Sequence, residues 1–410
     1  MTREMMEQKQ LQQAERRIAP QLEAIAEREL VNQQRVLDIF RKHNVSAFHF
    51  QHSTGYGYDD TGREVLDRVY ADVFGTGAAI VRQQFISGTH AISTALFAAL
   101  RPGGRLLYAT GTPYDTLKTV IGLNGSEAGT MNEWGIGCDV VPLAGGCVDM
   151  GAVHEAVTPE TQVIAFQRSR GYDDRPSIGL EEMKEYMAEL KQAYPEIVLF
   201  VDNCYGEFVE TSEPGHIGAD LMAGSLIKNP GGGITRTGGY IAGRSDLVEK
   251  AGASFAAPGI GLEGGATLGM LQEMFQGLFL APHVVAEAHK GAVLTAALME
   301  DAGLQASPAS GEERTDLIQS VQFGDRDKMI RFCQAVQQYS PVDSGVTPQP
   351  SAMPGYSDEV IMAAGAFIQG SSIELSADGP IRPPYTAFVQ GGLTYAHVKI
   401  AVSEALKTIQ

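Results

Sequence analysis

Cysteine is scarce in this sequence, with four residues among 410. They stand at Cys138, Cys147, Cys204 and Cys333, and no two have the close spacing of a zinc or redox motif. The sequence therefore predicts neither kind of site. Buried free thiols in a reducing cytoplasm are the simplest interpretation of these cysteines.

Long apolar runs are absent as well, and no window approaches the roughly 20 apolar residues that a membrane helix needs. The polar segment from Met1 to Arg17 lacks the apolar core of a signal peptide. Basic residues are outnumbered, with 31 Lys and Arg against 49 Asp and Glu and a net charge of -18. A nucleic-acid surface needs clustered basic residues, which this composition does not favour. We expect a cytoplasmic protein that binds neither membranes nor nucleic acid.

Glycine, by contrast, is abundant, with 47 residues, so many tight backbone turns are expected. Apolar residues make up 44% and charged residues 20% of the chain, as in an ordinary globular protein. A chain of this length suits a large domain with a smaller one attached. We predict an N-terminal helix and dimer-contact arm over residues 1–60, a large domain over 61–285 and a small α+β domain over 286–410.

The hydrophobic pattern predicts an amphipathic helix from Pro20 to His43, followed by a glycine-rich and aromatic loop to Asp60. Beyond this loop, short apolar runs alternate with helical patterns such as 90–100, which indicates a mainly parallel sheet with crossover helices. The predicted strands of this sheet cover 78–81, 105–109, 140–143, 163–166, 197–201, 223–227 and 239–242.

The C-terminal part has a different pattern. A long helical stretch over 262–299 leads out of the large domain. A smaller α+β domain should follow, with a strand at 317–323, a helix at 328–339, a strand pair near 360–375 and a last helix from Thr394.

The first signal of chemistry is Asp202, which directly follows the apolar run from Ile197 to Val201. Ligands of open α/β sheets lie at the carboxyl ends of the strands, where this residue is expected. A buried carboxylate needs a cationic partner or strong hydrogen bonds to stay charged. A protonated pyridine nitrogen would supply that partner, although such an Asp taken alone is more often a helix cap or a metal ligand.

The second signal is Lys228, which ends another apolar strand in the segment SLIKNPGGG. A lysine buried there would have a lowered pKa and would be nucleophilic. A surface lysine leading into a loop is the plainer interpretation of the residue alone. A phosphate loop of the Walker type is excluded, because there the glycines precede the lysine. Ser225, three residues earlier, could contribute to a phosphate site.

The third signal is the junction Ser87-Gly88-Thr89-His90, where a predicted strand ends and an apolar helix begins. Free backbone N–H groups and the helix dipole make such a junction an anion site. A Ser or Thr at this place can also be a simple N-cap. The three signals support one another because they occur together in one chain.

The sequence blocks around these signals, SGTHAI, TPYDTL, VDNCYGEF and SLIKNPGGG, with FHFQHSTGYGYDDTGRE upstream, resemble the aluminium-resistance family of pyridoxal-phosphate (PLP) proteins. That family is related to cystathionine and methionine lyases. The resemblance extends from about Val36 to the C-terminus. It implies an α/β, aspartate-aminotransferase-like fold (fold type I) and PLP as the cofactor. It also implies a homodimer with shared active sites, and such dimers can pair into tetramers.

The resemblance assigns several residues to the cofactor phosphate. The turn Ser87-Gly88-Thr89 matches the phosphate-binding turn, and Ser225 matches a phosphate-binding serine. In related lyases a tyrosine and an arginine near the N-terminus reach across the dimer to the neighbouring phosphate. Tyr56, Tyr58 and Arg63 occupy the comparable stretch, and which tyrosine acts is left open.

The resemblance also assigns the ring of the cofactor and its aldehyde. Tyr114 matches the aromatic that stacks on the pyridine ring, although His90 could stack there instead. Asp202 matches the carboxylate at the pyridine nitrogen. Lys228 matches the lysine that carries PLP as a Schiff base and then acts as the base at the α-carbon. Tyr56 or Tyr114 could assist the leaving group.

Two arginines are candidates for binding the α-carboxylate of a substrate. Arg168 lies in the segment QRSRGYDDRPS and Arg382 in DGPIRPPY. Arg382 resembles an arginine of the C-terminal domain in the relatives, although its proline-rich surroundings differ from theirs. Arg168 and Arg170 could instead contact phosphate or shape the pocket.

The reaction that the resemblance implies is β- or γ-elimination from a sulfur-containing amino acid by a carbon–sulfur lyase. Transamination, racemisation and decarboxylation remain as alternatives, because these reactions share the early steps of PLP chemistry. A non-catalytic protein that sequesters PLP or a hard trivalent cation is a rival of another class. No histidine pair has metal-ligand spacing, and no metal site is predicted.

Overall fold

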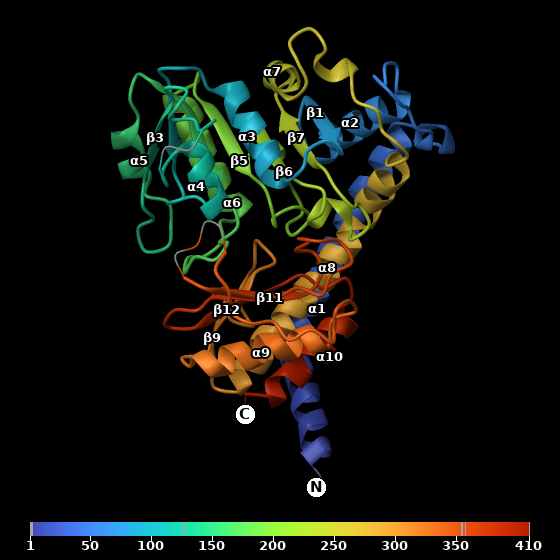
Figure 1. Cartoon of the computed structure of the whole chain (residues 1–410), viewed down its shortest axis with the longest axis vertical. Helices are drawn as coiled ribbons and strands as arrows, with labels where there is room; N and C mark the ends of the chain where they lie inside the picture. The colour runs from blue at the N-terminus through green and yellow to red at the C-terminus, as the bar shows by residue number, and fades with distance from the viewer. Residues whose placement is uncertain (1–2, 126–127, 354–355, 357, 410) are drawn as a thin grey trace.

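The computed structural model describes residues 3–125, 128–353, 356 and 358–409. A seven-stranded sheet and a five-stranded sheet organise this part of the chain (Figure 1). Within it, no helix is both long and apolar enough to cross a membrane.

The seven-stranded sheet has the order β1-β7-β6-β5-β4-β2-β3. Strand β7 runs antiparallel to both its neighbours, and the other pairs within β2 to β6 are parallel. This confirms the predicted mainly parallel sheet. The strands are β1 (Ala78–Arg82), β2 (Arg105–Tyr108), β3 (Gly137–Val140), β4 (Thr161–Gln167), β5 (Val198–Asp202), β6 (Leu221–Ser225) and β7 (Gly239–Gly243).

Both faces of this sheet are covered, as the apolar strands require. Along β5, Val198 and Phe200 belong to one hydrophobic core, whereas Leu199 and Val201 belong to the other. This alternation follows from the two-residue period of a strand. The helices of the large domain are α2 (Thr61–Val73), α3 (Gly88–Ala99), α4 (Asp115–Ile121), α5 (Met150–Ala156), α6 (Leu180–Ala193) and α7 (Ser245–Phe255).

The C-terminal domain is built on the five-stranded antiparallel sheet, with the order β10-β11-β12-β9-β8. It lies at the lower end of the molecule in Figure 1. A second sheet, separate from the first and antiparallel, is thus present in the C-terminal part of the chain. Its elements are β8 (Gln305–Ser307), β9 (Gln319–Gln322), α9 (Arg326–Gln338), β10 (Val360–Ala363), β11 (Ser376–Pro380), β12 (Thr386–Gln390) and α10 (Tyr395–Lys407).

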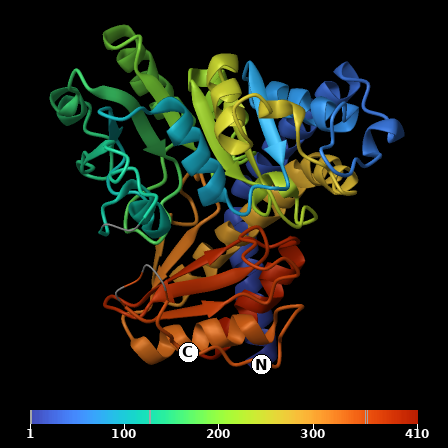
Figure 2. The ribbon, with the colours of Figure 1, turned by 45° about the horizontal axis from the view of Figure 1, so that its top comes forward.

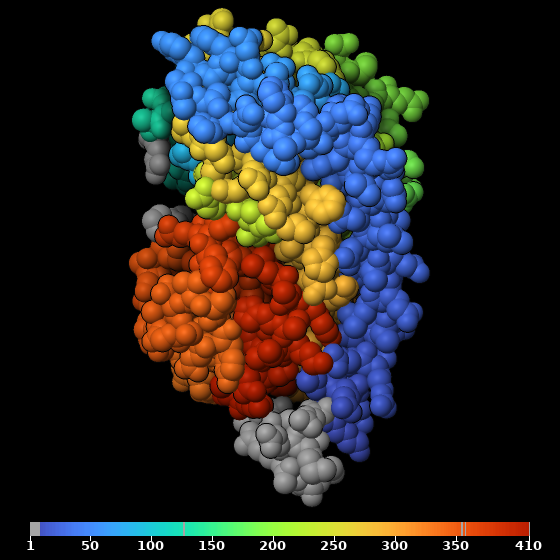
Figure 3. All heavy atoms as spheres, turned by 90° about the vertical axis from the view of Figure 1, so that its right-hand side faces the viewer, coloured from blue at the N-terminus to red at the C-terminus, as the bar shows by residue number. Residues whose placement is uncertain are grey.

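Two long helices join the domains. Helix α1 (Arg3–Lys42) packs along α8 (Leu271–Asp301), and Figure 3 shows the pair running side by side down the molecule. Both helices serve two cores: α8, for example, places Phe275 in the core of the large domain and Leu294 in that of the small domain. The predicted boundary after residue 285 falls inside α8, and the exact domain limits stay a prediction.

Some predicted elements are displaced. The strand expected at 223–227 is β6 and ends at Ser225, because its antiparallel partner β7 begins at Gly239 opposite that residue. The helix expected from residue 262 begins only at Leu271. The left-handed residues Gly265, Leu268 and Gly269 interrupt the chain before it. The strand expected at 140–143 is β3 and ends at Val140.

Candidate active site

A pocket of about 810 Å³ opens at the carboxyl ends of β4, β5 and β6, which are parallel and therefore end at one edge of the sheet. Its walls come from both domains, and Figure 2 shows the small domain, in orange and red, facing the large one. This volume lies in the usual range of small-molecule sites.

Lys228 lies at the wall of this pocket, three residues beyond the end of β6. Its Nζ is 4.1 Å from the ring centroid of Tyr205, close enough for a cation–π interaction. Burial acts to lower the pKa of the ammonium, but the acidic groups around it, Cys204, Tyr205 and Asp202, together hold that pKa above its ordinary value. The lysine is thus a cation beside an acid, and the lowered pKa expected from its burial is wrong, because the neighbouring acidic groups outweigh the effect of burial.

Asp202 is the last residue of β5 and is 3% exposed. Its Oδ1 accepts a hydrogen bond of 3.1 Å from the backbone N–H of Cys204. Burial raises the pKa of this carboxyl, and the nearby Lys228 opposes that rise. The carboxylate therefore depends on a cation in the pocket to stay ionised.

The first turn of α3 forms another wall of the pocket. Ser87 caps the helix, since its side chain accepts a hydrogen bond of 3.1 Å from the N–H of His90. A Cβ on Gly88 would lie 3.1 Å from the Cβ of Ser225, so a side chain would crowd this place. Glycine leaves the backbone N–H groups of the helix start open to an anion.

Tyr114 lines the same pocket and caps α4. Its hydroxyl is 3.0 Å from the hydroxyl of Thr89, and its backbone N–H donates to Gln167 at 3.0 Å. Burial raises the pKa of the Tyr114 phenol, which stays protonated at neutral pH. His90 points elsewhere: its ring packs against Phe85 and Phe255. Tyr114 is thus the pocket residue of the two.

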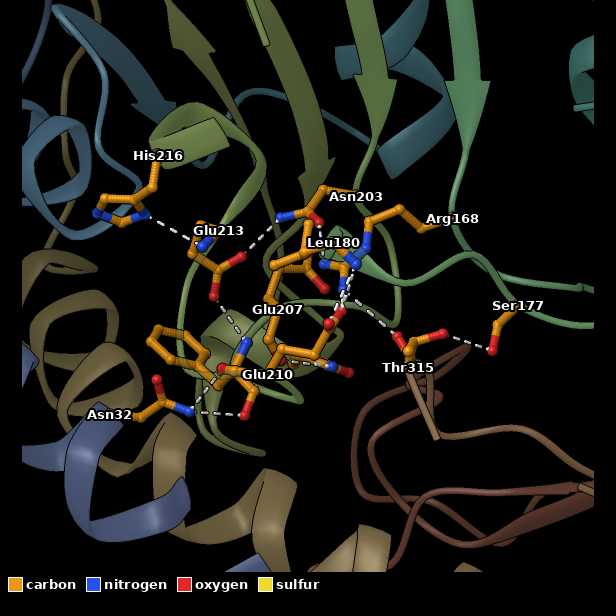
Figure 4. Close-up of polar contacts among 12 residues, drawn as sticks. Asn32, Arg168, Ser177, Leu180, Asn203, Glu207, Glu210, Glu213, His216 and Thr315 are labelled. Carbon is orange, nitrogen blue, oxygen red and sulfur yellow. Dashed lines mark hydrogen bonds and ion pairs between the residues drawn. The ribbon is translucent and has the colours of Figure 1, made fainter. Parts of the chain in front are cut away.

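Arg168 is not in the pocket, and the expectation that it binds a substrate does not hold in this structure. Its side chain is fully buried behind the pocket wall. Nη1 donates to Asn203 at 2.8 Å, and Nη2 forms an ion pair with Glu210 (Figure 4). An arginine whose charge is already paired inside the protein has no free face for a carboxylate.

The network behind the wall extends beyond Arg168, as Figure 4 shows. Asn203 donates to Glu213 at 3.1 Å, and Asn32 of α1 donates to the carbonyl of Phe208 at 2.8 Å. These contacts hold the loop 203–213, whose first residues form the pocket wall. Tyr205 and Phe208 of this loop adopt left-handed backbone angles, which such a network can enforce.

The N-terminal arm lies away from this pocket. Tyr56 and Tyr58 are 75% and 53% exposed, and their rings stack on each other at 5.4 Å. Arg63 is 2% exposed, and its guanidinium donates to the carbonyls of Gly57, Glu263 and Gly265 at 2.5 to 2.9 Å. The two tyrosines are therefore available to another subunit, whereas Arg63 organises its own loop.

Arg382 reaches the mouth of the pocket from the small domain. It is exposed, and its Nη1 pairs with Asp358 at 3.2 Å. Arg170, on the other hand, lines the pocket and is 2% exposed. Both arginines lie in segments singled out from the sequence, but nothing in the sequence pattern indicates that Arg170 is the buried one.

Sequence reasoning missed three tyrosines of the pocket, Tyr172, Tyr205 and Tyr356. Tyr172 donates to the buried Asp378 at 3.3 Å, and burial raises the pKa of that carboxyl to about 7. Tyr205 stands three residues after Asp202 in the block VDNCYGEF, which is the one signal that could have marked it. The other two lie in loops without a recognisable pattern.

These residues fit PLP group by group. Lys228 offers an amine for the aldehyde, Asp202 a carboxylate for the pyridine nitrogen, and the start of α3 with Ser225 a place for the phosphate. The close approach of Gly88 to Ser225 is the feature that a phosphate cradle needs, because backbone groups must come near the anion. In the described part of the chain, no group of three or more His, Cys, Asp and Glu side chains is placed to hold a metal ion.

Comparison with known proteins gives concordant matches. The methionine gamma-lyase family matches residues 7–410. The uncharacterized Bacillus subtilis protein YnbB is 57% identical over 394 residues, which cover 96% of this chain and 93% of YnbB. A solved structure from Listeria monocytogenes, named as a proposed cystathionine beta-lyase involved in aluminum resistance, has 54% identity and a TM-score of 0.97, covering 98% of this chain and 100% of its own.

A carbon–sulfur lyase involved in aluminum resistance from Clostridium novyi has 46% identity and a TM-score of 0.95, covering 98% of this chain and 96% of its own. The pyridoxal-5'-phosphate-dependent protein YhfS from Escherichia coli is more distant, at 19% identity with a TM-score of 0.63, covering 94% of this chain and 97% of its own. At that identity the likeness shows a common fold alone.

Proposed function

The chain belongs to the methionine gamma-lyase family, and from that premise we propose that it is a PLP-dependent carbon–sulfur lyase. Its substrate would be a sulfur-containing amino acid, cleaved by β- or γ-elimination. Family membership confirms the relationship that the motif blocks predict. The names of the Listeria and Clostridium relatives support the proposed reaction, since their identities of 54% and 46% extend over nearly the whole chain.

One observation carries the proposal. Lys228 and Asp202 lie in the wall of one pocket, together with the anion-binding start of α3. An amine, a carboxylate and a phosphate cradle are the three groups that PLP requires from a protein. A likeness in fold to YhfS supports the finer assignment to the aspartate-aminotransferase-like fold type I.

When bound, PLP supplies an electron sink for the negative charge that forms at the substrate α-carbon. Asp202 would keep the pyridine nitrogen protonated, because a buried carboxylate is stabilised by a cation beside it. Lys228 would first hold the cofactor covalently through Nζ. Released by the incoming amino group, the same Nζ would take the α-proton.

A proton must also reach the departing sulfur. The hydroxyl of Tyr114 is suited to donate it, since this phenol is protonated and lies 3.0 Å from the hydroxyl of Thr89. Tyr56 would take this role only from another subunit, because it is exposed on the arm. Elimination would then release the thiol, and hydrolysis of the remaining unsaturated amino acid by one water molecule would yield a keto acid and ammonia.

We also propose a homodimer with shared active sites, in which Tyr56 or Tyr58 contributes to the phosphate site of the neighbouring subunit. Their exposure, 75% and 53%, supports this role. Arg63 takes no part in it, because its guanidinium is bonded to carbonyls of its own chain. Pairing of dimers into a tetramer and a cytoplasmic location stay predictions from the sequence.

The test is to incubate the purified protein with cystathionine, cysteine and methionine and to measure thiol and keto acid. The wild type should absorb near the visible edge of the ultraviolet and release both products. Transamination or racemisation would give other products from the same substrates. Lys228→Ala should lose the covalent cofactor and the turnover, whereas Lys118→Ala, which removes another lysine of the pocket, should keep the covalent cofactor. A fully active Lys228→Ala enzyme with bound cofactor would refute the mechanism.

A further inference from the structure

Three arginines meet where the two domains join, and we call Arg170, Arg175 and Arg314 the junction arginines. They are 2%, 6% and 3% exposed. Arg170 and Arg175 follow β4 of the large domain, and Arg314 precedes β9 of the small domain. Three guanidinium charges are therefore held almost entirely out of water, where each needs an opposite charge or a full set of acceptors.

The acceptors that these guanidiniums find are neutral. Arg170 donates to both the carbonyl and the hydroxyl of Ser307, at 2.7 and 3.2 Å. The other two donate to backbone carbonyls, from Arg175 to Pro176 at 3.0 Å and from Arg314 to Pro308 at 3.1 Å. Hydrogen bonds of this kind satisfy N–H groups but leave the charge unpaired.

Two buried acids lie beside them within the described residues: Asp202, 3% exposed, interacts with the charge of Arg175, and Asp316, 1% exposed, interacts with the charges of all three. The two oxygens of Asp316 accept from the backbone N–H groups of Arg170 and Ile318, each at 3.1 Å. In the part of the chain that the structure describes, no carboxylate lies within 4.0 Å of a junction guanidinium. Of the other nearby acids, Asp173, Asp174 and Glu312 are exposed and Glu300 is half-buried.

The cluster therefore holds more positive than negative charge. Burial lowers the pKa of all three guanidiniums, that of Arg314 to about 10. Among the described residues, the Nε of each, and Nη1 of Arg314 as well, has no hydrogen-bond partner although it is buried. An anion held beside the cluster would offset its excess positive charge.

Arg170 is the member that lines the active-site pocket. In the sheet order, β5 with Asp202 lies between β6, which carries Ser225, and β4, which leads to Arg170. The phosphate cradle at Ser225 and α3 and the guanidinium of Arg170 are thus on opposite sides of the ring site. The substrate must therefore be held on the side of Arg170, because the cofactor phosphate occupies the other side.

We propose that Arg170 binds the α-carboxylate of the substrate, with Arg175 and Arg314 adding positive charge behind it. The inference rests on the proposed function and names the group that the site must recognise. Because Arg170 is also bonded to Ser307 of the small domain, the bound carboxylate would sit at the domain junction. The substrates would then be amino acids with a free carboxylate, and amines without one would bind poorly.

The other cations of the pocket are less suited to this role. Arg382 is exposed and already paired with Asp358, and Lys118 is paired with Asp115 at 2.7 Å. Water and a fixed partner carboxylate both weaken the attraction for a second carboxylate. Lys228 is committed to the cofactor in the proposed mechanism.

The test compares two ligands that differ by the carboxylate alone, L-norleucine and n-pentylamine. Neither has a sulfur to eliminate, so binding to the holoenzyme can be followed by the change in its visible absorbance. Arg170→Gln should raise the apparent Kd for norleucine by about 10- to 100-fold and that for pentylamine by less than about threefold. Arg170→Lys, which keeps the charge but not the planar fork, should fall between wild type and Arg170→Gln.

Arg382→Ala serves as the matched control and should change both constants by less than about threefold. An equal loss for both ligands in Arg170→Gln, or a carboxylate-selective loss in Arg382→Ala, would overturn the proposal. Should Arg170→Gln fail to fold, the same comparison with Arg170→Lys decides. If the wild-type protein shows no cofactor absorbance and no response to either ligand, the proposed function fails. If the wild-type protein responds to both ligands but substitution of Arg170 leaves both Kd values unchanged, only the role proposed for Arg170 fails.

Discussion

Arg168 and Arg170 lie two residues apart after the same strand, yet the protein treats their charges in opposite ways. Arg168 is paired with Glu210 and bonded to Asn203 inside the fold. Arg170 is buried as well, but it finds carbonyl and hydroxyl acceptors and no acid within ion-pair distance in the described residues. A buried charge that is paired inside the protein thus serves the fold, whereas an unpaired one at a pocket is available to a ligand.

The balance of buried charge around the two arginines differs in the same way. Behind the pocket wall, Arg35 and Arg168 face Glu210 and Glu213, and burial raises the pKa of a third acid, Glu207, to about 8. That acid is therefore largely neutral at pH 7, and the charges nearly balance. The junction arginines have no such balance, since within the described residues the two buried acids beside their three charges are Asp316 and Asp202, and neither lies within ion-pair distance of a junction guanidinium.

The largest expected difference between the two arginines is in their effect on stability. Arg168→Ala leaves Glu210 and Asn203 without their buried partner, which should lower the free energy of unfolding by about 3 kcal/mol. Arg170→Gln should lower it by about 1 kcal/mol or less, because only hydrogen bonds to neutral acceptors are lost. Urea unfolding of the two variants beside the wild type measures both values. Equal losses of stability in the two variants would show that the two buried charges are satisfied to the same extent.

A second, smaller effect concerns pH and Glu207. In the folded protein its pKa is about 8, against an ordinary value of 4.5. Between these values the unfolded chain binds fewer protons than the folded one, so stability falls as the pH rises. From about pH 6 to about pH 7.5, wild-type stability should fall by about 2 kcal/mol more than that of Glu207→Gln.

Urea unfolding at the two pH values checks this expectation. Glu249→Gln, which changes an exposed glutamate on α7, is the matched control and should follow the wild type. If Glu207→Gln and the wild type lose stability in parallel, Glu207 is ionised at both pH values. The charges behind the pocket wall would then not balance as described.

The smallest expected effect is on PLP binding at the phosphate cradle. Gly88→Ala puts a methyl group 3.1 Å from the Cβ of Ser225, where the phosphate cradle leaves little room. We expect the affinity for PLP to fall about tenfold and the stability of the apoprotein to change by less than about 1 kcal/mol. Titration of the apoprotein with PLP, read from its absorbance, measures the loss. Gly345→Ala, where a Cβ meets nothing within 4 Å, should leave the affinity unchanged.

Much of the site could be predicted from the sequence because its parts stand at the ends of regular elements. Asp202 and Lys228 follow apolar strands of a sheet predicted to be mainly parallel, and Ser87 begins an apolar helix. Parallel strands end at one edge of a sheet, so the three positions could be expected near that edge. The family could be predicted because the motif blocks themselves resemble those of a known family.

The rest depends on contacts between residues far apart in the sequence. Contacts with Glu210 and Ser307 decide which arginine of the segment QRSRGYDDRPS faces the pocket. No local sequence pattern connects these two residues to that segment. The position of Tyr205 under Lys228 depends on a left-handed backbone angle of φ 69°, which a tyrosine seldom adopts. Arg63 matched a family pattern, but it is bonded to the loop around Glu263.

The central claim is that the amine of Lys228 carries PLP in a pocket that Asp202 completes. Reduction of the purified enzyme with borohydride, followed by mass spectrometry of its peptides, tests this most directly, since reduction makes the cofactor linkage permanent. We expect a phosphopyridoxyl group on the peptide that contains Lys228. A group on Lys118, which lines the same pocket, or no modified lysine after saturation with PLP, would contradict it.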